Sequence, residues 1–315
     1  MSADTIVGID IGGTKTHVRL ERLGGKLLHD EVFATPTWRA ESNNEKARLV
    51  HSWIAKAIPT ERVGAVALGA HGCDNDGDSE RLRQRMLYLL DVPTIVVNDA
   101  QLLAAAAGLP ESIELIAGTG SIAVGRTAKG DSVYAGGWGW LIGDEGGAGG
   151  LVRDAVRRLA RAADDNSVGD PLEAKLLTVS GDRDLKLLTM RMMRRGGAAF
   201  TNWAPALFQA ADEGSLVAMA AIESGAEELV RLVKVLIARG VEPRTVVTAG
   251  SVIVNQPRLS EAVRARLSHD CGLDLVILDT APVNGAIQLA RGLLNLDPTA
   301  PTPCSGSEPS LSATR

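Results

Sequence analysis

The first stretch of the chain alternates apolar and polar positions around a pair of glycines. β-Branched residues recur over 5–11, the pair Gly12-Gly13 interrupts them, and apolar residues then alternate with polar ones over 16–20. Alternation with a period of two on both sides of a glycine pair is typical of a β-hairpin. We therefore expect two antiparallel strands over 5–20 and a third strand over 26–34.

The rest of the chain switches between helical and strand periodicity. A strand, a Gly-rich turn and a second strand recur over 113–126, which resembles the opening hairpin. Residues 164–214 are expected to be mostly helical with breaks, and Ser79 is the expected N-cap of its helix. The other expected helices are 44–58, 79–90, 99–107, 151–163, 215–239, 256–268 and 283–294, and the other strands are 63–68, 94–97, 113–117, 122–126, 244–248 and 273–278. This order predicts an α/β protein.

Composition and charge narrow the class of protein. A chain of 315 residues has room for about two domains. Its 45% hydrophobic and 23% charged residues are ordinary for a soluble protein and disfavour extensive disorder, although the Pro- and Ser-rich tail over 297–315 is expected to be disordered. The formal net charge of −5 offers no basic surface, so we expect no nucleic-acid partner.

Cysteine usage and hydropathy indicate the compartment. The three cysteines lie far apart and form no CxxC pair, which argues against a disulfide framework and a structural zinc site. No apolar run approaches the roughly 20 residues that span a bilayer, and the start of the chain has no signal-peptide pattern. We therefore expect a cytoplasmic protein without a membrane partner.

Glycine is abundant, at 34 residues, and it gathers in short motifs. The first motif runs from Asp10 to Thr16 and reads DIGGTKT, a near miss to the phosphate-binding P-loop. Such a turn lets backbone amides and the hydroxyls of Thr14 and Thr16 converge on an anion, and the Asp10 carboxylate could hold Mg²⁺ through water. The alternative is an ordinary tight hairpin with a solvated aspartate.

A second glycine motif, Gly118-Thr119-Gly120-Ser121, lies between the two strands of the repeat. Gly-Thr-Gly is common in turns, but two such loops about a hundred residues apart suggest two halves of a clamp on one polyphosphate. Between them, Asn98-Asp99 ends a buried strand. Asp99 could cap the following helix, or it could accept a hydroxyl proton during phosphoryl transfer.

The densest glycine run covers 136–150 and holds two of the five tryptophans, Trp138 and Trp140. It suggests a shaped loop around a ligand, in which Asp144 and Glu145 could bond sugar hydroxyls; the alternative is that the two tryptophans staple two domains together. The segment 249–252 follows a strand and could let a purine lie close to the backbone. His71 and Cys73 either line a cleft or are ordinary loop residues.

These motifs, in this order, resemble the sugar-kinase branch of the actin-like superfamily. VGIDIGGTKT is similar to its first phosphate motif, VVNDA to its connecting motif, LIAGTGSIAVG to its second phosphate motif and VVTAGSVI to its adenosine motif. GGWGWLIGDEGGAGGLVRDAV is most similar to the N-acetylglucosamine kinases and their relatives in the BadF/BadG/BcrA/BcrD ATPase group. The resemblance covers about residues 5–294.

The resemblance implies an α/β fold of two actin-like (ribonuclease H-like) domains. Each would hold a mixed five-stranded sheet flanked by helices, with ATP and Mg²⁺ in the cleft between them. The first domain would cover 1–110 and the second 111–282, with the last helix, 283–296, packing back on the first domain. Family members are often dimers, which makes a homodimer one option.

The resemblance also assigns residues. Asp99 would be the catalytic base, and Asp10 would hold Mg²⁺ through water. The expected contacts to ATP are Gly12, Gly13, Thr14, Lys15, Thr16, Gly118, Thr119, Gly120, Gly250 and Ser251. The expected contacts to the sugar are Asn98, Asp99, Ser121, Gly137, Trp138 and Asp144.

The implied activity is transfer of the γ-phosphoryl group of ATP to the 6-hydroxyl of N-acetylglucosamine. Glucosamine, N-acetylmannosamine and N-acetylmuramic acid are alternative acceptors. A partner-activating ATPase of the same group is a further alternative, although LIAGTGSIAVG lacks the cysteines that the redox activators use for an iron-sulfur cluster.

Overall fold

The computed structural model describes residues 5–58, 62–166, 169–196 and 200–295. Its first half is built on one sheet with the strand order β3-β2-β1-β4-β5. β1 pairs antiparallel with β2, and β2 with β3, whereas β4 and β5 run parallel to β1. The elements are β1 (Thr5–Ile11), β2 (Lys15–Arg22), β3 (Leu27–Ala34), α1 (Asn43–Ala57), β4 (Val63–Ala70), α2 (Asp76–Leu90) and β5 (Thr94–Val97). The expected three-stranded opening is confirmed.

A second sheet has the same topology. β6, β7 and β8 form an antiparallel meander, and β9 and β10 run parallel to β6, giving the order β10-β9-β6-β7-β8. The strands are β6 (Ser112–Ala117), β7 (Ser121–Arg126), β8 (Ser132–Gly136), β9 (Thr245–Ala249) and β10 (Asp274–Ile277). The weak repeat between the two hairpins therefore reflects two copies of one sheet topology. β8 was not predicted, because it is a short edge strand without a run of buried apolar residues.

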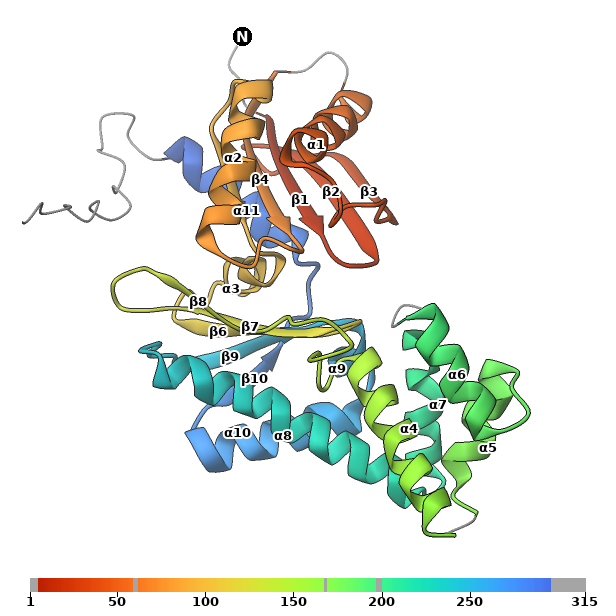
Figure 1. Cartoon of the computed structure of the whole chain (residues 1–315). Coiled ribbons are helices and arrows are strands. Elements are labelled where there is room, and N and C mark those ends of the chain that lie inside the picture. Colours follow the sequence, from red (N-terminus) through yellow and green to blue (C-terminus); the bar gives the residue numbers. More distant parts are fainter. Residues whose placement is uncertain (1–4, 59–61, 167–168, 197–199, 296–315) are drawn as a thin grey trace, which may run out of the picture.

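Helices cover both sheets (Figure 1). α8 and α10 lie on the outer face of the second sheet, and α4 to α7 form a lobe beside it. The bounds are η1 (Asp99–Gln101), α3 (Leu102–Ala107), α4 (Ala148–Asp164), α5 (Pro171–Ser180), α6 (Leu185–Arg195), η3 (Thr201–Trp203), α7 (Ala204–Asp212), α8 (Leu216–Ala238), α9 (Ser251–Asn255), α10 (Pro257–Cys271) and α11 (Val283–Asn295).

Two helix starts differ from the sequence prediction. α2 is capped by Asn75, whose side chain accepts the Asp78 N–H at 2.9 Å, so Ser79 is a buried residue of the first turn and not the cap. The η1 turn is capped by Asn98 and not by Asp99. In both cases a neighbouring asparagine side chain satisfies the free N–H groups, and periodicity does not distinguish adjacent capping residues.

The last helix connects the two halves. α11 packs on β1 and β4, where a Cβ on Gly8 would lie 2.8 Å from the Ile287 nitrogen. α11 also touches α3, with a Cβ on Gly285 placed 2.0 Å from the Leu102 oxygen. α3 in turn packs Leu103 against Val247 and Ala249 of the second sheet. The end of the described chain therefore packs on the first sheet, and α3 is the helix that packs between the two sheets.

Some expectations fall outside these observations. The tail over 297–315 and residue 296 of the last helix lie outside the described residues. The domain limits at 110 and 282 stay predictions.

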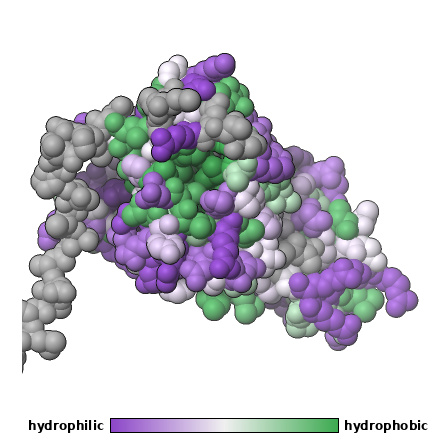
Figure 2. Space-filling model, turned by 90° about the horizontal axis from the view of Figure 1, so that it is seen from above, coloured by the Kyte–Doolittle hydropathy of each residue, from purple (hydrophilic) through white to green (hydrophobic). Residues whose placement is uncertain are grey.

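None of the helices in the described ranges is long and apolar enough to cross a membrane. Seen from above the first domain, the surface carries mostly hydrophilic residues around a group of apolar ones (Figure 2).

Candidate functional site

The turn between β1 and β2 presents the first glycine motif. The Gly12 N–H donates to the Lys15 carbonyl at 2.9 Å, and the Thr35 hydroxyl donates to the Gly12 carbonyl at 2.8 Å. Gly13, Thr14 and Lys15 are exposed at the tip. Thr16 is buried and its hydroxyl bonds that of Thr35 at 3.1 Å. Thr35, which directly follows β3, therefore holds the tip, while Gly13, Thr14 and Lys15 are exposed to a ligand. The phosphate contacts stay predictions.

The turn between β6 and β7 interlocks with the start of α4. The Ala148 N–H donates to the Gly118 carbonyl at 2.8 Å, and a Cβ on Gly147 would lie 2.6 Å from the Gly120 carbonyl carbon. Thr119 is exposed at the outer side of this turn. The glycine motifs 118–121 and 136–150, which are separate in the sequence, therefore form one packed unit, because only glycine permits backbones to approach so closely.

The glycine after β9 joins this unit. Gly250 has a φ of 116°, and a Cβ there would lie 2.4 Å from the Ala117 oxygen. Gly118 and Gly250 thus touch at the carboxyl ends of the parallel strands β6 and β9, with Ser251 exposed beside them. This edge of an α/β sheet is where ligands commonly bind. The second phosphate motif and the adenosine motif are therefore adjacent in space.

Asp10 and Asp99 meet at the corresponding edge of the first sheet. Asp10 on β1 pairs in register with Gly69 of β4, which pairs with Val97 at the end of β5. Burial raises the pKa of Asp10 to about 8, and the Asp99 carboxylate adds to the rise. Burial and then the Asp74 carboxylate raise the pKa of Asp99 to about 7, against backbone N–H groups that lower it. A cation between these carboxylates would relieve their repulsion.

The donor set fits Mg²⁺ bound together with phosphate. Within the described ranges, no cluster of three or more His, Cys, Asp or Glu side chains could form a cage for a metal. Mg²⁺ in phosphate sites typically uses one or two carboxylates, the substrate's phosphates and several waters. Asp10 supplies one such carboxylate, so it would hold the ion only with nucleotide present.

Asn98 ties the first-domain loops together. Its side-chain oxygen accepts the Ala100 N–H at 3.0 Å, and its amide donates to the Cys73 carbonyl and to Asp74 Oδ1, both at 3.2 Å. The side chain is buried, so it fixes the direction in which Asp99 projects. Its expected sugar contact stays a prediction. Cys73 is also buried, which raises the pKa of its thiol to about 11 and makes it a poor nucleophile.

Asp144 lies on the second domain in a strained backbone conformation. Its φ is 59°, its Oδ1 accepts the Ser121 N–H at 3.2 Å, and a Cβ on Gly120 would lie 2.7 Å from its carboxyl carbon. Burial raises its pKa, while the Ser121 N–H lowers it. A non-glycine residue at positive φ persists when its surroundings fix it, and such residues gather at functional sites. The Ser121 hydroxyl donates to the Glu145 carbonyl at 2.7 Å.

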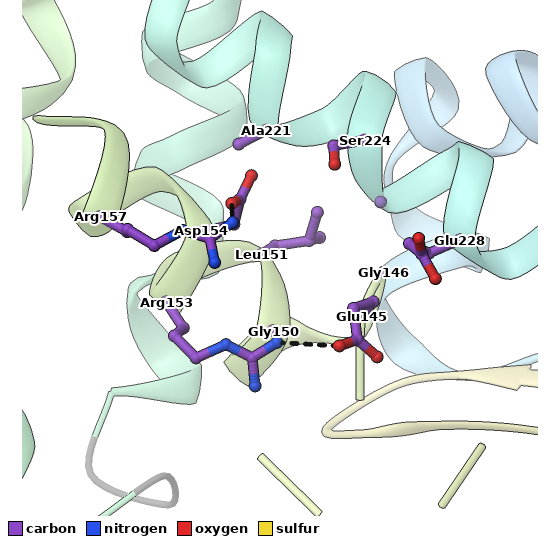
Figure 3. A pocket seen from close by; sticks show the side chains of 11 residues that line it. Glu145, Gly146, Gly150, Leu151, Arg153, Asp154, Arg157, Ala221, Ser224 and Glu228 are labelled. Atoms are coloured by element: carbon purple, nitrogen blue, oxygen red, sulfur yellow. Dashed lines mark hydrogen bonds and ion pairs between the residues drawn. The ribbon is translucent and has the colours of Figure 1, made fainter. Parts of the chain in front are cut away.

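Arg153 of α4 holds the loop that carries Asp144 and Glu145; Figure 3 shows its guanidinium beside the Glu145 carboxylate. Its guanidinium donates to the carbonyls of Trp140 and Gly143, and it pairs with the Glu145 carboxylate at 3.3 Å. Behind this loop, α4 and α8 enclose a pocket of about 200 Å³ lined by Glu145, Arg153, Asp154, Arg157 and Glu228, among others. Arg157 pairs with Asp154, and Arg153 pairs with Glu145, so these charged side chains of the pocket neutralise one another. Arg153 belongs to the motif GGWGWLIGDEGGAGGLVRDAV, but residue spacing alone does not show that its side chain holds this loop.

The two tryptophans of the glycine run have separate environments. Trp140 packs edge-to-face on Phe200 at 5.4 Å between ring centroids, within the helical lobe. Trp138 is 76% exposed and follows Gly137, whose φ is 73°. The alternative of two tryptophans that staple the domains together is therefore wrong. The sugar contacts of Gly137 and Trp138 stay predictions.

His71 and Arg39 of the first domain lie within electrostatic reach of Asp144. His71 follows β4; its N–H donates to the Ile11 carbonyl at 2.8 Å and its carbonyl accepts the Trp38 indole N–H at 3.0 Å. Burial and then Arg39 lower the pKa of His71, while Asp74 and Asp144 raise it. The same Arg39 acts to lower the pKa of Asp144. Asp144 therefore lies within electrostatic reach of the β4–α2 loop, and the sequence analysis missed Arg39 because no motif contains it.

Comparison with known proteins covers nearly the whole chain. The sequence model that describes the BadF/BadG/BcrA/BcrD ATPase family matches residues 7–290. A Clostridium acetobutylicum protein named N-acetylmuramic acid/N-acetylglucosamine kinase is 29% identical over 303 residues, which are 91% of this chain and 98% of that protein. A Dictyostelium discoideum protein named N-acetyl-D-glucosamine kinase is 25% identical over 256 residues, 75% of this chain and 80% of that protein.

The fold also matches solved structures. A crystal structure of a Chromobacterium violaceum protein superposes with a TM-score of 0.69 at 23% identity, covering 92% of this chain and all of that one. At this identity the likeness concerns the fold alone. It agrees with two actin-like domains, each with a mixed five-stranded sheet flanked by helices, as the sequence analysis expected.

Proposed function

Because the chain belongs to the BadF/BadG/BcrA/BcrD ATPase family, we propose that it is an ATP-dependent amino-sugar kinase that phosphorylates the 6-hydroxyl of N-acetylglucosamine. Two curated relatives are named for kinase activity on N-acetylglucosamine. The observation that carries the proposal is the half-buried Asp99 at the end of β5, whose pKa of about 7 suits a base near neutral pH. It lies beside Asp10 at an edge where the loops of the first sheet converge.

The nucleotide would lie between the two glycine turns. Thr14 and Lys15 from the first domain and Thr119 and Gly120 from the second would contact its phosphates. Gly250 and Ser251 would flank the adenosine, since they touch the turn that holds Gly118. Mg²⁺, held by Asp10 through water, would supply neutralisation of the phosphate charge.

The sugar would lie between Asp99 and Asp144. The Asp99 carboxylate would accept the proton of the 6-hydroxyl as the bond between that oxygen and the γ-phosphorus forms and the bond to the ADP oxygen breaks. Asp144, fixed by Ser121 and Gly120, would accept hydrogen bonds from other hydroxyls of the ring. Most of the catalytic effect would come from holding the reacting groups in line.

An ATP-consumption screen tests the proposal. Glucosamine, N-acetylglucosamine, N-acetylmannosamine, N-acetylmuramic acid and glucose are compared with a reaction that contains no sugar, and the products are identified by NMR. We expect the fastest turnover with an N-acetylated sugar and phosphate on its 6-oxygen. Turnover without sugar that equals the best sugar would instead favour a partner-activating ATPase. A cytoplasmic location and a homodimeric state belong to the same proposal.

A further inference from the structure

The short turn that carries Asp99 is held between the two sheets. On the side of the first sheet, the Asn98 side chain bonds the Cys73 carbonyl and Asp74. On the other side, η1 packs on β6 and β7 of the second sheet. Asp99 is the first residue of this three-residue turn, so the direction of its carboxylate follows the orientation of the turn.

Gln101, the last residue of the turn, makes a polar contact with the second sheet. Its Oε1 accepts the backbone N–H of Asn98 at 3.1 Å, and its Nε2 donates to the Ser132 Oγ at 3.2 Å. The side chain is only 9% exposed, and a hydrogen bond made away from water is electrostatically stronger. One amide group therefore joins the backbone beside Asp99 to the first residue of β8.

β8 has supports of its own, which do not involve the base. The Tyr134 carbonyl accepts from the guanidinium of Arg239, directly after α8, at 2.8 Å. The Tyr134 hydroxyl donates to Asp76, the first residue of α2, at 3.4 Å. Ser132 is therefore a fixed point of the second sheet, from which Gln101 can orient the turn.

The proposed chemistry requires such an attachment. A base must lie within hydrogen-bond reach of the proton that it accepts, and a misplacement of about 1 Å can lower the rate about 100-fold. Asn98 restrains the start of the turn and Gln101 restrains its end. A turn of three residues that was attached at its start alone could still rotate about that point.

We propose that Gln101 is a positioning residue, which aligns the Asp99 carboxylate with the sugar hydroxyl through its bond to Ser132 of the second sheet. This inference rests on the proposed function. Gln101 would touch neither the sugar nor ATP, so it would act on kcat through Asp99. The alignment of the base would thereby depend on both halves of the protein, which also enclose the proposed nucleotide and sugar.

The test measures kcat for the sugar with the fastest turnover, in wild type and in Asp99→Asn, each with and without Ser132→Ala. Ser132→Ala removes the bond to the second sheet and leaves the bond between Gln101 and Asn98. It should lower kcat about 3- to 10-fold in the wild-type background, as expected for one hydrogen bond, and by less than about 2-fold in Asp99→Asn. A merely structural role would lower kcat equally in both backgrounds.

Two further variants separate the hydrogen bonds from the bulk of the side chains. Ser132→Thr keeps the hydroxyl and should hold kcat within about 2-fold of wild type. Gln101→Met loses both bonds at nearly the same volume, so it should lower kcat about 10- to 100-fold and change the KM for ATP by less than about 3-fold.

Ser268→Ala is the matched control, since Ser268 is exposed on α10 of the second half, and it should leave kcat unchanged in both backgrounds. Equal losses from Ser132→Ala in the two backgrounds, or no loss in either, would overturn the inference while the proposed function stands. A wild type whose ATP turnover does not depend on sugar would overturn both.

Discussion

Replacing Asp99 by asparagine should make the protein both slower and, at pH 8, more stable. Asparagine keeps the shape of the side chain and removes the ionisable carboxyl. The Asp99 pKa is raised from 3.8 to about 7, first by burial and then by Asp74. Ionisation of the group that would act as the base therefore lowers the stability of the folded protein.

The sign and size of the stability change follow from this pKa. A carboxyl whose pKa is higher in the folded protein binds protons more tightly there, so its contribution to stability is lost as pH rises from about 4 to about 7. A rise from 3.8 to about 7 corresponds to at most about 4 kcal/mol at pH 8. Removal of the Asp99 charge also lowers the pKa of Asp10, which adds in the same direction.

Two assays check this prediction. Urea unfolding at pH 5 and pH 8, without nucleotide or Mg²⁺, should show wild type losing more stability than Asp99→Asn between the two pH values. In the kinase assay, wild-type kcat/KM for the sugar should rise with pH to a plateau above about 7. The variant should lose that rise together with about 10²- to 10⁴-fold of kcat.

Asp131→Asn is the control, since Asp131 is exposed in the turn between β7 and β8 and should change neither readout. A kcat for Asp99→Asn within tenfold of wild type would refute the assignment of the base. Equal pH dependence of stability in variant and wild type would refute the claim that the fold raises this pKa.

Other expectations concern the supports of the site. Gly250→Ala should lower the free energy of unfolding in urea by about 3 kcal/mol and raise the KM for ATP, because its Cβ would overlap the Ala117 oxygen. Gly272→Ala is the control: at a φ of 66° with open space around it, it should lower that free energy by only about 1 kcal/mol and leave the KM for ATP unchanged. Arg153→Ala should raise the KM for the sugar by a factor about ten times larger than the factor by which it raises the KM for ATP. A general loss of folded protein would not produce this difference. Asp10→Asn should raise the Mg²⁺ concentration for half-maximal turnover about 10- to 100-fold, and an unchanged value would exclude it from the metal site.

Several features of the site could be predicted from local sequence. Gly120 and Gly250 were singled out as places where the backbone comes close to a ligand, and the structure shows that the protein's own atoms also come close there: a Cβ on Gly120 would overlap the Asp144 carboxyl, and one on Gly250 the Ala117 carbonyl. The hairpins around the two phosphate motifs were also predicted, because a glycine turn between alternating strands is a local pattern. The order of these motifs sufficed to indicate the family.

Other features required the fold. The sequence left open whether Asp99 caps its helix, and the structure shows that the adjacent Asn98 does, because each has the right chemistry and only the backbone geometry selects one. β8 was missed because an edge strand needs few apolar residues. Neither error moved a proposed site residue, since the strand ends that carry those residues were located correctly.

The sequence by itself determined which backbone positions are tight, because glycine at a turn is a local steric requirement that no distant residue alters. Only the tertiary structure decided which charges meet. Asp10 and Asp99 come within electrostatic reach of each other because β1, β4 and β5 are neighbours and run parallel, and Arg39 pairs with Asp74 from a separate segment. Electrostatic interactions depend on distance in space and on burial, and neither quantity is fixed until the strands and helices have packed.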